Sequence, residues 1–461
     1  MDRGKINFIA AILFFVAFAV ALLTYAFVKP PTLLGLVPII LYSALVLLGF
    51  DVVLSTLAAL FISIIMTGQT PVSTAALFAE SLGSFISIVG LIIILGSGLG
   101  QVAQETGVVT TLVKWIIEKV GARTQTRVQL GVMITSTTLV ALLGTLAGAN
   151  AILAPIVIPI LAAVGFTPPA VAAMLHAAGA PGLFVGPFTP PVVTLTGVSG
   201  VPYVNYLAVA GVPMAATTWI VGFFMARWIQ KKTYGKVAYE EAELVKKLQE
   251  PTPQAIRATA AFILTIVVMV IYGIYVKAPY SYALVVMLVT AFITGLAGGR
   301  NPIDILRSIY AGASKLLWLF ILFWLFNPII TLMGKTGAYD ALLQTLSPVL
   351  QVIGPYGFCL MALVVGWLGV SGAAVAQVAV VNEMFKPIVA ALGIPPTAWV
   401  GVLLGSSQID WFGPFPNADM VGQMGLARSK DLRMQLLNGW AIMAANFIMF
   451  AILFAVLLSM R

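Results

Sequence analysis

The sequence predicts an all-α polytopic membrane protein built from two inverted-topology repeats. Three observations support this prediction: 61% of the 461 residues are hydrophobic and only 8% are charged, long apolar runs recur along the chain, and three pairs of segments repeat at one spacing. A helix needs about 20 apolar residues to cross a hydrocarbon core of about 30 Å. Because backbone groups in lipid must be paired internally, these runs are predicted to be helices. We expect roughly 11 to 15 membrane segments, some interrupted or re-entrant.

The charge pattern excludes several classes of function. The net charge is +9, yet the basic residues stand singly between apolar runs and form no dense patch that would predict nucleic-acid binding. The sequence has a single cysteine, Cys359, which excludes an internal disulfide, and it has no metal-ligand spacing. It also lacks a Gly-rich phosphate loop and a Ser/His/Asp set, so we predict neither an ATP-driven pump nor an enzyme, and no cofactor.

An internal repeat organises the chain. The repeated pairs lie at an offset of about 230 residues, which unrelated apolar helices would not produce. They are "FISIIMTGQTP" (61–71) with "FITGLAGGRNP" (292–302), "PILAAVGFTPP" (159–169) with "PIVAALGIPP" (387–396), and "FVGPFTPP" (184–191) with "WFGPFPN" (411–417).

The repeat divides the chain into four parts. We expect an N-terminal extra transmembrane helix at 1–29, a first repeat at 30–230, a charged linker at 231–256 and a second repeat at 257–461. The first apolar run is long and lacks a small-residue cleavage site, so it is predicted to be a retained span rather than a signal peptide.

The charge of equivalent loops predicts that the two halves have opposite orientations. Segment 121–128 carries two arginines, whereas its counterpart 347–357 is uncharged. Segment 200–206 is uncharged, whereas its counterpart carries three cations between 428 and 433. Because Lys and Arg concentrate on the cytoplasmic side, the N-terminus and the linker are predicted to be cytoplasmic. Inverted repeats of this kind are typical of secondary transporters, whose sites lie near the midplane of the membrane.

Polar residues beside predicted helix breaks are the candidate ligands of a substrate. An interrupted helix presents a positive N-terminal end that suits a carboxylate. The predicted substrate-binding residues are Gly148, Ala149, Asn150, His176 and Thr189 in the first half, and Ser371, Gly372 and Gln377 in the second.

The stretch "DWFGPFPNAD" (410–419) supplies the candidate cation site. Asp410, Asn417 and Asp419 are predicted to couple transport to a proton or a sodium ion. A helix from Thr397 to Ile409 would rise about 20 Å, which places Asp410 past the middle of the membrane. Burial disfavours the charged form of a carboxylic acid, so proton coupling is physically available.

Structural explanations for the same residues stay open at this point. Both proline-rich stretches are also compatible with ordinary turns between full spans. Asp419 is nearer to water than Asp410, and His176 stands alone among small residues, where a packed histidine is a common alternative to a proton carrier. Serine and asparagine also bond neighbouring helices together in membrane bundles.

Several motifs resemble known transporter families. The run "GWLGVSGAAVAQ" (366–377), with "ALGIPPTAWVGVLLGSSQ" (391–408) and "GLARSKDLR" (425–433), resembles the C-terminal half of the lactate permease family, and "HAAGAPG" (176–182) resembles gluconate permeases. Both families belong to the ion transporter superfamily. The sequence departs from the lactate permeases, because only Ser371 and Gln377 remain of their polar run. The resemblance implies a cation-coupled carrier of small organic anions, with an elevator-like or rocking motion and often a homodimer.

Together these features predict a proton- or sodium-coupled symporter in the cytoplasmic membrane. Its substrate would be a small carboxylate such as gluconate, lactate or a dicarboxylate. A sodium/proton antiporter of the same superfamily is the alternative, although a single convincing membrane acid, Asp410, argues against it. Few pore-lining charges argue against a channel.

Overall fold

The computed structural model describes residues 3–120, 124–239, 250–367 and 374–459. These ranges contain helices and turns and no strand, which confirms the all-α prediction. The elements of the first half are α1 Arg3–Phe27, η1 Leu33–Leu36, α2 Val37–Leu47, α3 Val52–Met66, α4 Pro71–Leu82, α5 Phe85–Glu105, α6 Val108–Val120, α7 Gln125–Leu143, α8 Leu146–Ala163, α9 Pro168–Val185, α10 Pro190–Ser199, α11 Tyr203–Tyr206, η2 Leu207–Gly211 and α12 Val212–Thr233. Those of the second half are α13 Pro253–Tyr275, α14 Tyr282–Ala297, α15 Pro302–Lys315, α16 Leu317–Lys335, α17 Ala338–Trp367, α18 Ala374–Ala391, α19 Pro396–Gln408, η4 Ile409–Phe412, α20 Ala418–Leu426 and α21 Leu432–Ser459.

The chain is a multi-pass membrane protein. Ten helices in the described ranges are long and apolar enough to cross a bilayer, and three shorter apolar helices cover Leu33–Leu47, Val52–Met66 and Tyr282–Ala297. These thirteen elements lie within the range expected from the sequence. Many side chains on their outer surfaces are large and apolar, as a lipid-facing surface requires.

The helices of the two halves follow one another in the same order. α4 and α15 both begin at a proline after a capping side chain, Thr70 and Asn301 respectively. α8, α9 and α10 correspond in the same way to α18, α19 and α20, which is the order that the repeat predicts. The boundaries of the two repeats and their orientation in the membrane stay predictions.

The segment 347–357 was expected to connect two spans. In the structure two helical segments of α17 meet there at a sharp kink. The helix bends at Gly354, whose φ of 63° and ψ of −173° are non-helical, between Pro348 and Pro355. Proline removes a helical hydrogen bond and glycine tolerates a left-handed φ, so the chain changes direction there without a loop.

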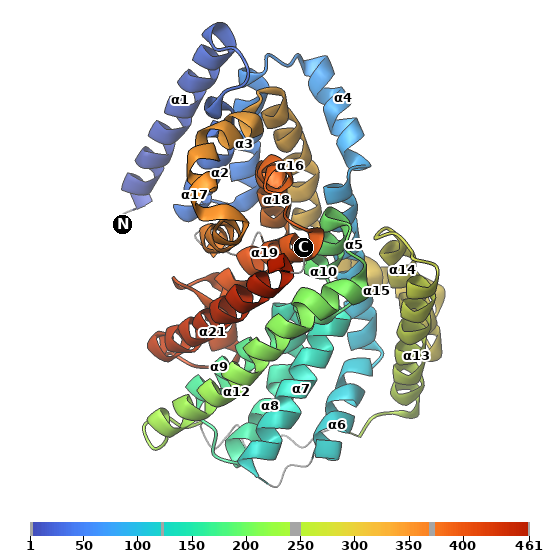
Figure 1. Cartoon of the computed structure of the whole chain (residues 1–461). Coiled ribbons are helices and arrows are strands. Elements are labelled where there is room, and N and C mark those ends of the chain that lie inside the picture. Colours follow the sequence, from blue (N-terminus) through green and yellow to red (C-terminus); the bar gives the residue numbers. More distant parts are fainter. Residues whose placement is uncertain (1–2, 121–123, 240–249, 368–373, 460–461) are drawn as a thin grey trace.

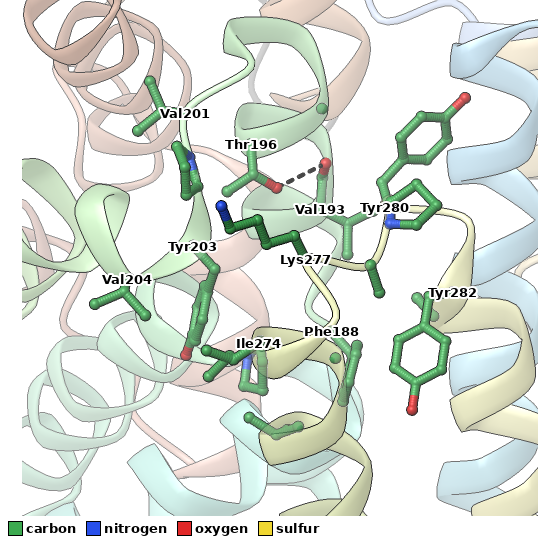
Figure 2. Close-up of a pocket in the computed structure, with 18 of the residues that line it drawn as sticks. Phe188, Val193, Thr196, Val201, Tyr203, Val204, Ile274, Lys277, Tyr280 and Tyr282 are labelled. Atoms are coloured by element: carbon green, nitrogen blue, oxygen red, sulfur yellow. Dashed lines mark hydrogen bonds between the residues drawn. The ribbon is translucent and has the colours of Figure 1, made fainter.

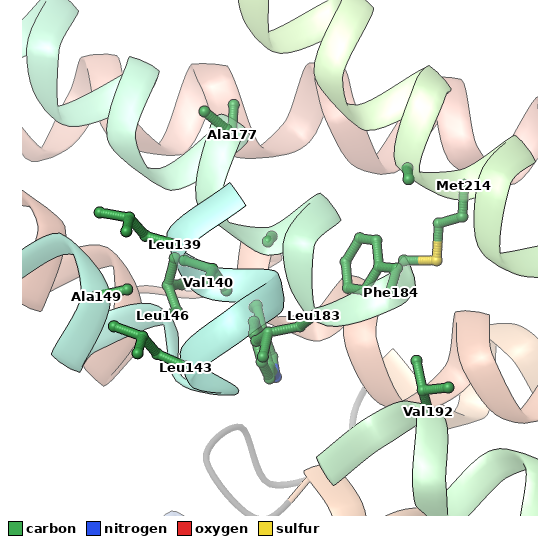
Figure 3. Packing of buried hydrophobic residues seen from close by; sticks show 14 of the residues in the cluster. Leu139, Val140, Leu143, Leu146, Ala149, Ala177, Leu183, Phe184, Val192 and Met214 are labelled. Carbon is green, nitrogen blue, oxygen red and sulfur yellow. The ribbon is translucent and has the colours of Figure 1, made fainter. Parts of the chain in front are cut away.

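Helix α9 lies at the centre of the larger hydrophobic core. Every residue from Pro168 to Phe184 is buried. α9 packs against α7 and α12, and Figure 3 shows its apolar side chains among those of the neighbouring helices. α9 and α7 approach each other closely at Gly182. A methyl group added to this glycine would lie 2.8 Å from the Ala141 nitrogen. A second hydrophobic cluster, built mainly from α2, α3, α5 and α16, lies toward the other end of the molecule (Figure 1).

The two halves exchange short helices. α10 of the first half packs on α18 and α19 of the second, and α20 of the second half packs on α8 and α9 of the first. Each short helix follows a break, so each half completes its packing through the other half. This exchange buries Thr189 at the first break and Asp410 just before the second, whereas Phe415 and Pro416 of the second break are exposed.

The close approach of α9 and α7 predicts a specific loss of stability. Gly182→Ala places a methyl group against backbone atoms of α7, which cannot move as a side chain can, so we expect a destabilisation of about 1 to 3 kcal/mol. The measurement is the midpoint of thermal unfolding in detergent. Gly422→Ala on α20 is the matched control, because nothing lies within 4 Å of the added methyl group. Equal midpoints for the two variants would contradict the packing described here.

Candidate functional site

The break of the first half lies between α9 and α10. α9 ends at Val185, and α10 begins after Thr189 with Pro190 as its first residue. The Thr189 hydroxyl is buried and lies 2.7 Å from the carbonyl oxygen of Leu183 and 2.8 Å from that of Gly186, to which it donates. Thr189 therefore satisfies backbone groups that the interruption frees, and its role as a substrate ligand stays a prediction.

The break of the second half lies between η4 and α20. Asn417 caps α20 by accepting a hydrogen bond from the Met420 nitrogen at 2.9 Å. Its amide nitrogen donates to the carbonyl oxygens of Asp410 at 3.1 Å and Trp411 at 2.8 Å. The Asn417 side chain thus links η4 to the start of α20 and stabilises the backbone at the break.

Two helix N-termini meet beside the first break. α8 begins at Leu146 with Thr145 as its cap, whose hydroxyl accepts from the Gly148 nitrogen at 3.3 Å. A methyl group added to the preceding Gly144 would lie 3.3 Å from Cδ of Pro190, the first residue of α10. The starts of α8 and α10 are therefore neighbours. A small cavity of about 10 Å³, near the size of one water molecule, lies between them and is also lined by Phe188.

Asn150 joins the halves of the protein. Its amide nitrogen donates to the carbonyl oxygen of Leu175 at 3.0 Å and to Oε1 of Gln423, on α20, at 2.8 Å. Its oxygen accepts from the Ser136 hydroxyl at 2.7 Å. Both amide hydrogens are in use and the neighbouring Ala149 is fully buried, so in this structure these two predicted ligands face the helix junction rather than a cavity.

His176 lies in the same junction. Its ring is fully buried, and Nδ1 lies 2.8 Å from the amide nitrogen of Gln435 on α21. Its Nε2 has no hydrogen-bond partner among the described residues. The ring centroid is 4.6 Å from that of Phe412, in η4. His176 thus contacts two elements of the second half, η4 and α21.

Asp410 is the most unusual polar group in the interior. The residue is 2% exposed, and neither carboxyl oxygen has a hydrogen-bond partner in the part of the chain that the structure describes. Asp419, in the first turn of α20, is near enough for its charge to act on Asp410. Asp410 and Asp419 are therefore close enough to interact electrostatically, and their role in cation coupling stays a prediction.

Further buried side-chain amides lie around α9 and were not among the residues predicted from the sequence. Gln423 and Gln435 are buried and each keeps one polar atom without a partner among the described residues, as does Asn438, whose amide is 3.5 Å from the Ala173 carbonyl oxygen. Glutamine and asparagine within the last apolar segments were the available signal. Their partners lie in the other half of the chain, which no local pattern reveals.

Of the remaining candidates, only Gln377, in α18, lies within the described residues. Ser371 and Gly372 lie outside the described residues. Gln377 donates from Nε2 to the carbonyl oxygens of Gly366 at 2.7 Å and Ser406 at 2.9 Å, while its Oε1 has no partner within the described ranges. Gln377 therefore links α17 to α19, and its oxygen is the part that is free to accept from a ligand.

A larger open cavity adjoins the break of the first half. It has a volume of about 570 Å³ and lies between α10, α11 and the turn from α13 to α14. Figure 2 shows Lys277, Tyr203 and Phe188 among the side chains that line it. Phe188 belongs to the repeated segment 184–191, but no local pattern points to Tyr203 or to Lys277, which comes from the other half of the chain.

Two comparisons with known proteins bear on the site. The family described as "DcuC: C4-dicarboxylate anaerobic carrier" matches residues 6–402. The fold is similar to that of the YdaH transporter of Alcanivorax borkumensis, a structure reported to reveal an unusual topology, with a TM-score of 0.61, 16% identity, and coverage of 88% of this chain and 98% of that chain. No curated protein matches the sequence.

The comparisons correct one expectation. They support a secondary carrier but not the resemblance to lactate or gluconate permeases. The motif "HAAGAPG" lies on the buried helix α9, where a methyl group added to Gly179 would lie 3.0 Å from the Asn150 amide nitrogen. Close helix packing explains its small residues without a gluconate site.

The bond between Asn150 and Gln423 predicts a measurable coupling. Asn150→Ala and Gln423→Ala should each lower stability, because each leaves a buried polar partner unsatisfied. The loss of stability in the double variant should be smaller than the sum of the two single losses by about 1 kcal/mol. This is the scale of hydrogen bonds between membrane helices. Unfolding in detergent measures all four proteins, and strictly additive losses would show that the two side chains do not interact.

Proposed function

The chain belongs to the C4-dicarboxylate anaerobic carrier family, and from this premise we propose that it is a cation-coupled symporter of a C4-dicarboxylate. The observation that carries the proposal is the meeting of the N-termini of α8 and α10 inside a membrane protein of this family. The cytoplasmic membrane is its proposed location, with the N-terminus on the cytoplasmic side.

The meeting helix ends supply attraction for a carboxylate. Each helix N-terminus carries the equivalent of about half a positive charge and unpaired backbone N–H groups. Carboxylates bind well at such ends without a lysine or arginine. Gly148 lies in the first turn of α8, and its N–H donates to the Thr145 hydroxyl, a bond that a bound carboxylate would have to replace. Thr145 and Thr189 hold the two ends in place.

Asp410 supplies the proposed cation site. An isolated carboxylate in a low-dielectric interior is strongly disfavoured unless a proton or a cation neutralises it. Asp410 is buried, and its two oxygens are unpartnered within the described ranges, so it has capacity for either ion. Asp419 adds a second negative charge nearby, which strengthens the attraction for a cation.

A continuous path of contacts links the two sites. Asn417 holds the backbone of Asp410 and caps α20. α20 carries Gln423, which accepts a hydrogen bond from Asn150 in the second turn of α8. An ion at Asp410 therefore changes the electrostatics of the helix that is bonded to the anion site. Coupling between such sites is a free energy, which requires that both ligands bias the same structural element.

Transport by purified protein in liposomes tests the proposal. We expect accumulation of labelled succinate when a sodium or proton gradient is imposed, and collapse of the accumulation when an ionophore removes that gradient. The sodium-free and constant-pH arms identify the coupling ion. Sodium/proton exchange without uptake of any C4-dicarboxylate would instead support the antiporter alternative and refute the symporter.

Asp410→Asn provides a residue-level prediction. The amide keeps the shape of the carboxyl group but cannot bind a proton or neutralise a cation, so gradient-driven accumulation of succinate should fall by roughly tenfold or more. Exchange of internal for external succinate without a gradient should fall much less. Asp340→Asn, at an exposed site in the first turn of α17, is the matched control. Unchanged accumulation by the Asp410 variant would remove Asp410 from the coupling site.

A further inference from the structure

The open cavity beside α10 has the properties of a ligand site. Its volume of about 570 Å³ lies within the roughly 300 to 1,000 Å³ of small-molecule sites, which are mostly apolar with a few polar groups. Lys277 is the one cationic side chain among its lining residues. Figure 2 shows the lysine side chain extending across the cavity toward the turn of α10 that contains Thr196.

The backbone of Lys277 is strained. Its φ is 51°, a left-handed value that only one other non-glycine residue, Arg428, adopts in the described ranges. The Lys277 nitrogen bonds to the carbonyl oxygen of Ile274 at 3.2 Å, and the Ala278 nitrogen bonds to that of Gly273 at 2.9 Å. This pattern ends α13 at a position where glycine is the usual residue. A lysine is disfavoured there, and strain of this kind clusters at functional sites.

The charge of Lys277 is available for a ligand. Its ammonium group has no ion-pair or hydrogen-bond partner among the described residues. α13 has 23 residues and is about 35 Å long, so Lys277 lies at the end of this helix that is distant from the linker. A cation near the C-terminus of α13 is also favoured by the helix dipole, which is a purely structural explanation that an experiment must separate from ligand binding.

Phe188 lies between this cavity and the anion site. It lines the 570 Å³ cavity, and it also lines the small cavity between the starts of α8 and α10. Its ring packs against both of the larger hydrophobic clusters of the protein. Phe188 is the one residue that lines both cavities, so its ring stands between a ligand in the open cavity and the helix N-termini.

We propose that the cavity is an anion vestibule in which Lys277 binds one carboxylate of a C4-dicarboxylate before the anion passes Phe188. This inference rests on the proposed function. A C4-dicarboxylate carries about two negative charges, whereas the meeting helix ends offer partial charges and no side-chain cation. Lys277 provides the full positive charge at the entrance that the inner site lacks.

Kinetics of succinate uptake separate ligand binding from helix capping. Lys277→Asn removes the charge and tolerates the left-handed backbone, so the KM for succinate should rise about threefold to fivefold with little change in maximal rate. The dependence of KM on ionic strength should also weaken, because screening acts on the lost charge. Lys277→Arg should retain the KM of the parent protein and its dependence on ionic strength. A merely structural lysine would lower the unfolding midpoint of Lys277→Asn and leave KM and its salt dependence unchanged, which would overturn the inference.

Chemical restoration of the charge gives a second test. Lys277→Cys should lower succinate uptake at subsaturating concentration. Modification with 2-aminoethyl methanethiosulfonate, which attaches an ammonium group, should restore it, whereas methyl methanethiosulfonate should not. The parent protein is the control, because its single cysteine, Cys359, is buried. Equal effects of the two reagents would contradict the role of Lys277 in the vestibule and leave the proposed function standing. A parent protein that takes up no C4-dicarboxylate would contradict the proposed function itself.

Discussion

A helix that ends inside a membrane protein leaves peptide groups that water cannot reach, and the rest of this structure depends on how those groups are satisfied. Each half of the chain contains one such break, and each break is followed by a short helix that packs on the other half. Thr189 and Asn417 bond the freed backbone groups at the two breaks. The fold therefore holds the two interrupted helices together through packing between the halves.

The two breaks share one architecture but differ in their chemistry. The first break lies where two helix N-termini meet, which is an environment for an anion. The second carries Asp410 and Asp419, which is an environment for a cation. Because α20 bonds to α8 through Gln423 and Asn150, the two environments lie on connected elements rather than on independent surfaces. The family match gives the anion its proposed identity as a C4-dicarboxylate.

The sequence predicted the architecture better than the site. Composition and the repeat indicated the helices, their order and both breaks, since these features are local or periodic. The bond between Asn150 and Gln423 joins residues 273 positions apart, and the cavity that contains Lys277 unites segments from both halves. Neither relation has a local signal. Residues 347–357 do separate two helical segments, but a glycine and two prolines are equally compatible with a loop and with the kink observed in α17, so the sequence does not distinguish the two. Ser371 and Gly372 lie outside the described residues and stay predictions.

The dependence of succinate affinity on the coupling cation tests whether α20 connects the two sites. Succinate binding to the purified protein is titrated calorimetrically with and without the cation that drives transport, in the parent and in Gln423→Leu. We predict that the cation tightens binding in the parent, and that this gain shrinks in the variant while the affinity without cation is retained. An equal gain in both proteins would show that coupling does not pass through the helix exchange.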